Sequence, residues 1–121
     1  MNMTINTRQV RSITIVDING RIVLEECALL RDVLSNLLAA GHRKILLNLA
    51  GANRVDTAGL AYLINGLVSA RKQQGELKLL SPAKDVREVL RFTKLDTFFE
   101  IIDDEAAALT SFSANSAAAN A

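Results

Sequence analysis

The feature that most constrains the fold is a junction at which a short apolar run gives way to an amphipathic segment. Residues 44–49 are nearly continuous in apolar side chains, as is typical of a central strand with both faces covered. Between Leu60 and about Gln74, apolar residues recur with the spacing of one helix face. Asp56 and Thr57 therefore fall at a helix N-terminus, where backbone N–H groups lack partners within the helix. A short oxygen-bearing side chain is favoured there, and an added phosphate is accommodated.

The same junction has a purely structural interpretation. Asp and Thr are common helix-capping residues, so capping alone accounts for Asp56 and Thr57. Gly59 has an equally simple role, because a residue without a side chain lets the first helical turn pack closely against a neighbour. The residues of the junction leave the capping role and the phosphate-accepting role both open.

The length and composition of the chain predict a single folded domain. The chain has 121 residues, of which 50% are hydrophobic, and this is enough for one sizeable core. Residues 113–121 contain only Ala, Ser and Asn, so no large apolar side chain offsets the entropy lost on ordering them. We expect a domain at 1–112 and a disordered tail at 113–121.

The charge balance excludes several classes of partner. The chain carries 14 Lys and Arg against 13 Asp and Glu, a net charge of +1, which gives no electrostatic attraction to nucleic acid or anionic lipid. Aromatic residues make up 4% of the chain, too few to stack single-stranded bases. No apolar run resembles a signal peptide or is long enough to span a bilayer. We therefore expect a cytoplasmic protein that binds a protein or a small ligand.

The order of the periodic segments predicts the fold class. Strands are expected at about 4–10, 12–18, 21–24, 43–49, 76–80 and 98–102, and helices at about 25–40, 57–74, 83–93 and from 103 onward. Asn19-Gly20 is a tight-turn sequence and predicts an antiparallel hairpin between the second and third strands. The order β-β-β-α-β-α-β-α-β-α predicts an α/β fold with a mixed sheet and helices mainly on one face, because parallel strands separated by helices need right-handed crossovers.

The apolar pattern also predicts which side chains are buried. Lone Cys27 falls on the apolar face of the first helix and is expected in the core, without a disulfide. The remaining inward-facing residues expected in the C-terminal third are Val86, Val89, Leu90, Phe92 and Leu109, with Phe112 as a further candidate.

The residues that carry catalysis are scarce. The chain has one histidine and one cysteine, no Gly-rich phosphate loop and no Ser-His-Asp set. His42 is expected to be an exposed loop residue, and the spacing of Asp17, Glu25, Asn48 and Asp56 selects no metal. We expect a protein that is not an enzyme and that needs no metal and no cofactor.

Three stretches of the sequence resemble the STAS domains, and in particular the single-domain anti-sigma factor antagonists. They are Asn-Gly-Arg-Ile-Val at 19–23, the apolar run at 44–49 followed by Val-Asp-Thr-Ala-Gly-Leu at 55–60, and the segment from Ser-Pro at 81–82 to Phe-Glu-Ile at 99–101. The middle motif is the most specific, and together the three cover most of residues 10–110.

The resemblance implies a switch based on phosphorylation. In the family, the hydroxyl residue directly after the motif Asp is phosphorylated, and that position is Thr57 here. By this resemblance, the unphosphorylated protein is expected to bind an anti-sigma factor, a serine/threonine kinase of the histidine-kinase-like ATPase fold, and so to free a sigma factor. Phosphorylation by the kinase is expected to reverse the binding. The partner-binding residues that the resemblance implies are Arg21, Val23, Asp56, Thr57, Ala58 and Gly59.

The sequence departs from the family pattern at four positions. Thr57 replaces the usual Ser, Arg21 and Val23 replace acidic residues, and Lys94 replaces a glycine at the turn after the third helix. At Lys94 a non-glycine residue is expected in a left-handed conformation. Other STAS domains are subunits of stressosome-like assemblies or of lipid and anion transporter complexes, without a kinase switch, and this is the alternative function.

Overall fold

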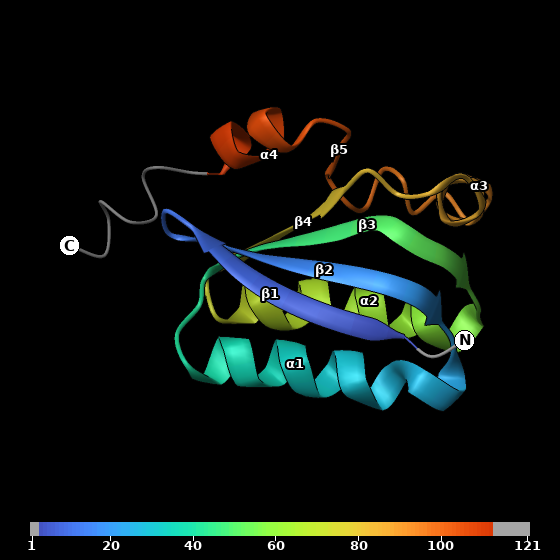
Figure 1. Ribbon diagram of the computed structural model, residues 1–121, viewed down its shortest axis with the longest axis horizontal. Helices are drawn as coiled ribbons and strands as arrows, with labels where there is room; N and C mark the ends of the chain where they lie inside the picture. The colour runs from blue at the N-terminus through green and yellow to red at the C-terminus, as the bar shows by residue number, and fades with distance from the viewer. Residues whose placement is uncertain (1–2, 113–121) are drawn as a thin grey trace.

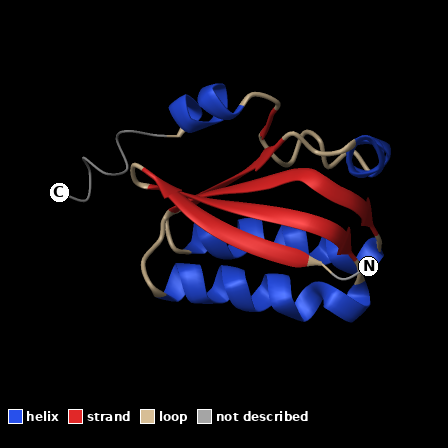
Figure 2. Cartoon of the chain, viewed as in Figure 1, coloured by secondary structure: helices blue, strands red, loops and turns tan. Residues whose placement is uncertain are grey.

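A five-stranded mixed sheet forms the centre of the structure, a computed structural model that describes residues 3–112. The predicted tail at 113–121 lies outside the described residues. The elements are β1 (Thr4–Val10), β2 (Ile13–Ile22), a short 3₁₀ helix (Leu24–Glu26), α1 (Cys27–Ala39), β3 (Lys44–Val55), α2 (Thr57–Lys72), β4 (Glu76–Leu80), α3 (Lys84–Phe92), β5 (Ile101–Ile102) and α4 (Glu105–Ser111). The strand order is β1-β2-β3-β4-β5, with β1 antiparallel to β2 and the other neighbours parallel (Figures 1 and 2).

The two faces of the sheet are covered unequally. Helices α1 and α2 lie side by side against one face, where the larger apolar core is found (Figure 1). The much shorter α4 packs on the opposite face, over a smaller cluster formed by Ile13, Ile15, Leu46, Leu80, Ala108 and Phe112. The predicted α/β class, with a mixed sheet and helices mainly on one face, is confirmed.

Strand β3 is the central element because both of its faces and both of its edges are covered. Ile45, Leu46 and Leu47 are fully buried, as the apolar run predicts, and β2 and β4 pair with the two edges. The strand extends to Val55, six residues past the predicted end at 49. It therefore delivers the chain directly to the start of α2.

The predicted hairpin at Asn19-Gly20 is wrong. Strand β2 runs through both residues without a break, so the separate strand expected at 21–24 does not exist, and the tight turn lies at Arg11-Ser12 between β1 and β2. Gly20 has a positive φ of 102° and occupies an irregularity in the β2–β3 register, a position typical of a β-bulge. Asn19 covers Gly51 of β3, where an added Cβ would lie 1.8 Å from Asn19 Oδ1.

Burial in the C-terminal third follows the prediction only in part. Val86 and Leu90 are buried as expected, but Phe92 is 91% exposed. Phe92 follows Leu90 by two residues, and at 3.6 residues per turn it lies about 200° around the helix from it. Leu109 is half-buried, and Ala108 occupies the buried position of α4 instead.

The sequence also predicts the burial of Cys27 and the extent of the last strand. Cys27 is fully buried in the larger core, as predicted. The last strand is shorter than expected, because 98–100 are not in the sheet and β5 consists of Ile101–Ile102 alone.

The turn after α3 contains a left-handed residue, as the sequence predicts. Lys94 has a φ of 63°, and its N–H donates to the Arg91 carbonyl at 3.0 Å. The next residue closes the helix end, since the Leu95 N–H donates to the Leu90 carbonyl at 2.8 Å. A side chain at such a position carries conformational strain that glycine does not.

Replacing Lys94 by glycine should therefore stabilise the protein. We expect Lys94→Gly to raise the free energy of unfolding by up to about 1 kcal/mol, since relief of the left-handed strain exceeds the added flexibility of the unfolded chain. The matched control is Arg91→Gly in the exposed last turn of α3, which should lower stability by about 1 kcal/mol. Urea unfolding measures both. A loss of stability in Lys94→Gly comparable to the control would show that residue 94 is not strained.

Candidate functional site

The candidate site is built on the cap of α2. The Asp56 carboxylate accepts two backbone hydrogen bonds, one from the Gly59 N–H to Oδ1 at 2.8 Å and one from the Leu24 N–H to Oδ2 at 3.1 Å. The backbone N–H of Asp56 donates to the Ile22 carbonyl at 3.3 Å. The residue therefore caps its own helix and ties it to the end of β2, more than thirty positions earlier in the chain.

Gly59 lets the first turn of α2 approach β2 more closely than any other residue would allow. A Cβ at this position would lie 1.9 Å from the Ile22 carbonyl oxygen, a backbone atom that cannot move aside cheaply. The close packing predicted for Gly59 is thus explained by one identified contact.

Thr57 is the first residue of α2 and is exposed to solvent. Within residues 3–112 its hydroxyl has no hydrogen-bond partner, and Asp56 alone provides the side-chain cap of this helix. Thr57 belongs to the first helical turn, whose backbone N–H groups lack partners within the helix and which lies at the positive end of the helix dipole. The Thr57 oxygen is therefore accessible, and a negative charge added to it would be favourable locally.

The charges around Thr57 are of both signs. The hydrogen bond from the Gly59 N–H, followed by that from Leu24 and the charge of Arg54, holds the pKa of Asp56 below its ordinary value. Arg54 is a direct neighbour of Arg21 in the β2–β3 register, and both are exposed. This end of the sheet therefore carries an ionised aspartate and two guanidinium groups, and that of Arg21 lies 3.7 Å from Glu26 Oε2.

The structure brings the predicted partner-binding residues to one end of the sheet, with different degrees of access. Arg21 and Thr57 are exposed, Asp56 and Ala58 are half-buried, and Gly59 and Val23 are buried. Val23 is only 5% exposed, so its side chain belongs to the packing beneath this surface.

One residue of this surface was missed from the sequence. Leu24 is 62% exposed and is held against the site by its hydrogen bond to Asp56. Its position at the end of an apolar run indicated a strand residue, and no local signal in the sequence marks it as exposed. Its contact with Asp56 depends on tertiary structure alone.

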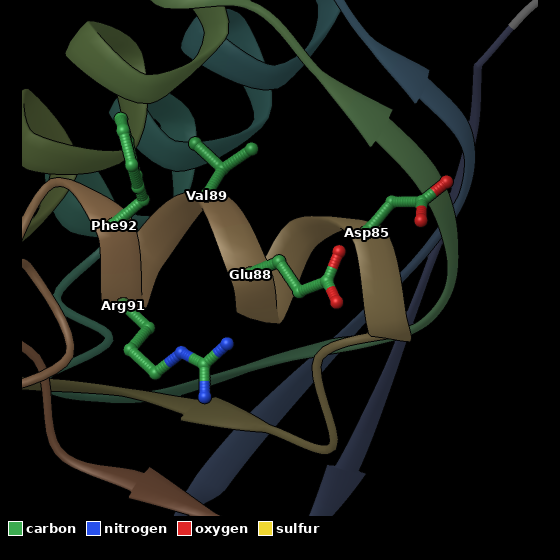
Figure 3. Close-up of a pocket in the computed structure, with 5 residues that line it drawn as sticks. All are labelled: Asp85, Glu88, Val89, Arg91 and Phe92. Atoms are coloured by element: carbon green, nitrogen blue, oxygen red, sulfur yellow. The ribbon is translucent and has the colours of Figure 1, made fainter.

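A concave region lies on α3, away from the residues of the candidate site. A hollow of about 590 Å³ is lined by Asp85, Glu88, Val89, Arg91 and Phe92, all from one helix. Val89 and Phe92 project from the same side of the helix, and Arg91 projects from the other (Figure 3). The lining of this hollow includes no histidine, cysteine or hydroxyl group.

Comparison with known proteins identifies the family. The family model described as "STAS domain" matches residues 4–108. The chain belongs to the STAS domain family. A protein of Thermotoga neapolitana named as a candidate anti-sigma factor antagonist is 32% identical to it over 101 residues, which are 83% of this chain and 89% of the relative.

Solved STAS structures share the fold. The crystal structure of a candidate anti-sigma factor antagonist from Thermotoga maritima matches with a TM-score of 0.84 and 28% identity, covering 89% of this chain and 93% of the other. The phosphorylated form of the Bacillus protein SpoIIAA matches with a TM-score of 0.67 and 18% identity, over 86% and 96% of the two chains. The second match is a likeness in fold.

The acidic and histidine residues considered from the sequence have other partners in this STAS domain. The Asp17 carboxylate accepts from Arg8, which holds its pKa below the ordinary value, and also from Asn48 Nδ2 at 2.8 Å. His42 is half-buried, with Nδ1 2.8 Å from Thr14 Oγ1, and is not the exposed residue expected.

The described part of the chain lacks two kinds of feature. Residues 3–112 contain no group of three His, Cys, Asp or Glu side chains placed to hold a metal ion. None of the described helices has the length and apolar character needed to cross a membrane.

The two backbone hydrogen bonds of Asp56 predict how stability depends on pH. The pKa of Asp56 is lowered on folding, so its ionised carboxylate adds to the free energy of unfolding. This contribution is present above the unfolded pKa near 3.8 and is lost as pH falls through the pKa of the folded state. Asn caps a helix well but offers one acceptor oxygen, so Asp56→Asn should cost about 1 kcal/mol at neutral pH. We expect this difference from the wild type to shrink on acidification.

Urea unfolding of the wild type and Asp56→Asn, from neutral pH to about pH 3, tests the prediction. Asp85→Asn is the control, because Asp85 is an exposed carboxylate in the first turn of α3. A difference between wild type and Asp56→Asn that is constant over the whole range would contradict the assigned role of the carboxylate.

Proposed function

We propose that this STAS domain is an anti-sigma factor antagonist, which binds an anti-sigma factor kinase and is switched off by phosphorylation of Thr57. The observation that carries the proposal is the exposed Thr57 hydroxyl at the N-terminus of α2, beside an aspartate that already caps the helix. The names of the Thermotoga relatives support the antagonist role. The proposal places the protein in the cytoplasm, where it regulates transcription.

The proposed contact surface surrounds the start of α2. Its centre is Thr57 and Ala58, its apolar part is the exposed Leu24, and its charged part is Arg21 with Asp56. Arginine is enriched at protein interfaces, and covering an exposed leucine with a partner removes apolar surface from water. In this proposal the buried Val23 and Gly59 position the surface and are not touched by the partner.

The kinase partner supplies the chemistry of the switch. A serine/threonine kinase of the histidine-kinase-like ATPase fold would transfer the terminal phosphoryl group of ATP to Thr57 Oγ1, with ADP leaving and the hydroxyl proton lost to a base of the kinase. The product carries about −1.5 to −2 additional charges in the centre of the contact surface. These charges lie next to Asp56 and must be desolvated on binding, so the partner is released.

The fold tolerates the same charge. The N-terminus of α2 favours an anion by about 0.3–1 kcal/mol, and among the described residues the Thr57 hydroxyl makes no hydrogen bond that phosphorylation would break. Binding and stability should therefore respond differently to a negative charge at residue 57.

Two variants of Thr57 test the proposal. Thr57→Ala should abolish phosphorylation and keep partner binding, whereas Thr57→Glu should weaken binding roughly 30-fold or more. The melting temperature should change little in either variant, because Asp56 still caps the helix. Binding is measured with the anti-sigma factor that copurifies with the tagged chain, and phosphorylation by mass spectrometry.

The control variant is Ser69→Glu, which places the same charge on an exposed position near the other end of α2. It should bind the partner as the wild type does. Equal affinities of Thr57→Ala and Thr57→Glu would place residue 57 outside the contact surface and favour a structural subunit without a kinase switch. Phosphate found equally on Thr57→Ala would move the switch to another hydroxyl, with Ser12, Ser81 and Thr93 the next candidates.

A further inference from the structure

A second hollow, of about 350 Å³, lies at the opposite end of the sheet from Thr57. It is formed where the β1–β2 turn, the start of β3 and the last turn of α4 come together, and Figure 1 shows this turn at the far end from the start of α2. Its lining residues are Arg11, Ser12, Ile13, Lys44, Leu109, Thr110 and Phe112. The volume falls at the lower end of the range for small-molecule sites.

Lys44 is the unusual member of this lining. It is only 7% exposed, and within residues 3–112 its ammonium group has one hydrogen bond, to Ser12 Oγ at 3.4 Å. Glu76, its partner in the β3–β4 register, lies 3.9 Å from the ammonium group of Lys78. A buried ammonium group is unfavourable unless an anion or several acceptors compensate for its lost hydration.

The other buried lysine of the chain shows what such compensation looks like. Lys78 is 6% exposed, and its Nζ donates to the Ser111 carbonyl at 2.7 Å, to Ser111 Oγ at 3.0 Å and to Glu100 Oε2 at 3.2 Å. Both lysines point to the α4 face of the sheet, since Lys44 and Lys78 share the alternation of Leu46 and Leu80. Within residues 3–112, Lys78 Nζ has three acceptors at 3.2 Å or less, whereas Lys44 Nζ has the Ser12 hydroxyl alone as hydrogen-bond acceptor. An anion bound in the hollow would add the acceptor that Lys44 lacks among these residues.

The rest of the lining indicates the chemistry of that acceptor. Arg11 adds a second cation, Ser12 and Thr110 add hydroxyl groups, and the lining contains no carboxylate. Ile13 and Phe112 are buried apolar side chains, and Leu109 is half-buried beside them. A ligand that matches the polar and the apolar part of the lining has an anionic head, which pairs with Lys44, and an apolar chain, which lies against the apolar side chains.

We propose that this hollow binds a free carboxylic acid with a straight alkyl chain, whose carboxylate pairs with Lys44 and whose chain lies against Ile13, Leu109 and Phe112. The site is separate from the Thr57 surface and does not depend on the proposed switch. Since three lining residues come from the end of α4, the bound acid also holds this helix against the sheet.

Calorimetry and thermal unfolding with octanoate test the proposal. Octanoate should bind with one site per chain and raise the melting temperature, while octanamide, which lacks the charge, and acetate, which lacks the chain, should each bind at least about tenfold more weakly. Lys44→Met should lower the affinity for octanoate by about the same factor. The matched control, Lys84→Met on the exposed first turn of α3, should bind as the wild type does.

A second pair of variants keeps the test independent of the folding of Lys44→Met. Thr110 is exposed at the rim of the hollow, so Thr110→Glu and Thr110→Gln should both fold. Thr110→Glu brings a carboxylate to the rim and should weaken octanoate binding at least about tenfold relative to Thr110→Gln.

Amide chemical shifts locate the bound acid. Octanoate should shift the amides of residues 11–13, 44 and 109–112 and leave those of 56–60 unchanged. No binding at millimolar octanoate, equal binding of octanamide and octanoate, or shifts centred on 56–60 would each overturn the proposal.

Discussion

The structure depends on the close approach between the first turn of α2 and the end of β2. The Ile22 carbonyl lies against Gly59 and accepts the Asp56 N–H, while the Asp56 side chain bonds the N–H groups of Leu24 and Gly59. This approach is possible because β2 and β3 are parallel and the crossover through α1 brings their ends to the same edge of the sheet. The segments that follow the two strands therefore meet, and their meeting point is the candidate site.

The two faces of the sheet are stabilised in different ways. The face under α1 and α2 is covered by an extensive apolar core, whereas α4 is short and buries few side chains. Polar contacts supplement its packing: Arg8 bonds both Asp17 and Glu105, and Lys78 bonds Ser111. Exposed ion pairs stabilise little individually, but Arg8 makes two hydrogen bonds to each carboxylate, which fixes the position of α4 as well as contributing energy.

Much of the fold was predictable from the sequence because its periodic segments agree with the tertiary structure. The helices α1 and α2 and the central strand have apolar patterns that depend on local spacing alone. Asn19-Gly20 failed because its turn propensity was overridden by pairing with β3, where Asn19 covers Gly51 and Gly20 forms the bulge. The true turn at Arg11-Ser12 has no glycine or asparagine, so its residues did not identify it. The position of the turn is therefore decided by contacts between residues far apart in the chain.

The same distinction explains which parts of the candidate site were predictable. Asp56 and Thr57 were found because helix capping is local, and their neighbour Leu24 was not, because it reaches the site through the fold. The structure also divides two tasks between adjacent residues: Asp56 holds the helix and its tie to β2, and Thr57 is left with an accessible hydroxyl. A residue that performed both tasks could not be modified without loosening α2. Because capping rests on Asp56, the hydroxyl of Thr57 is available for a charge that changes the surface and leaves the fold in place.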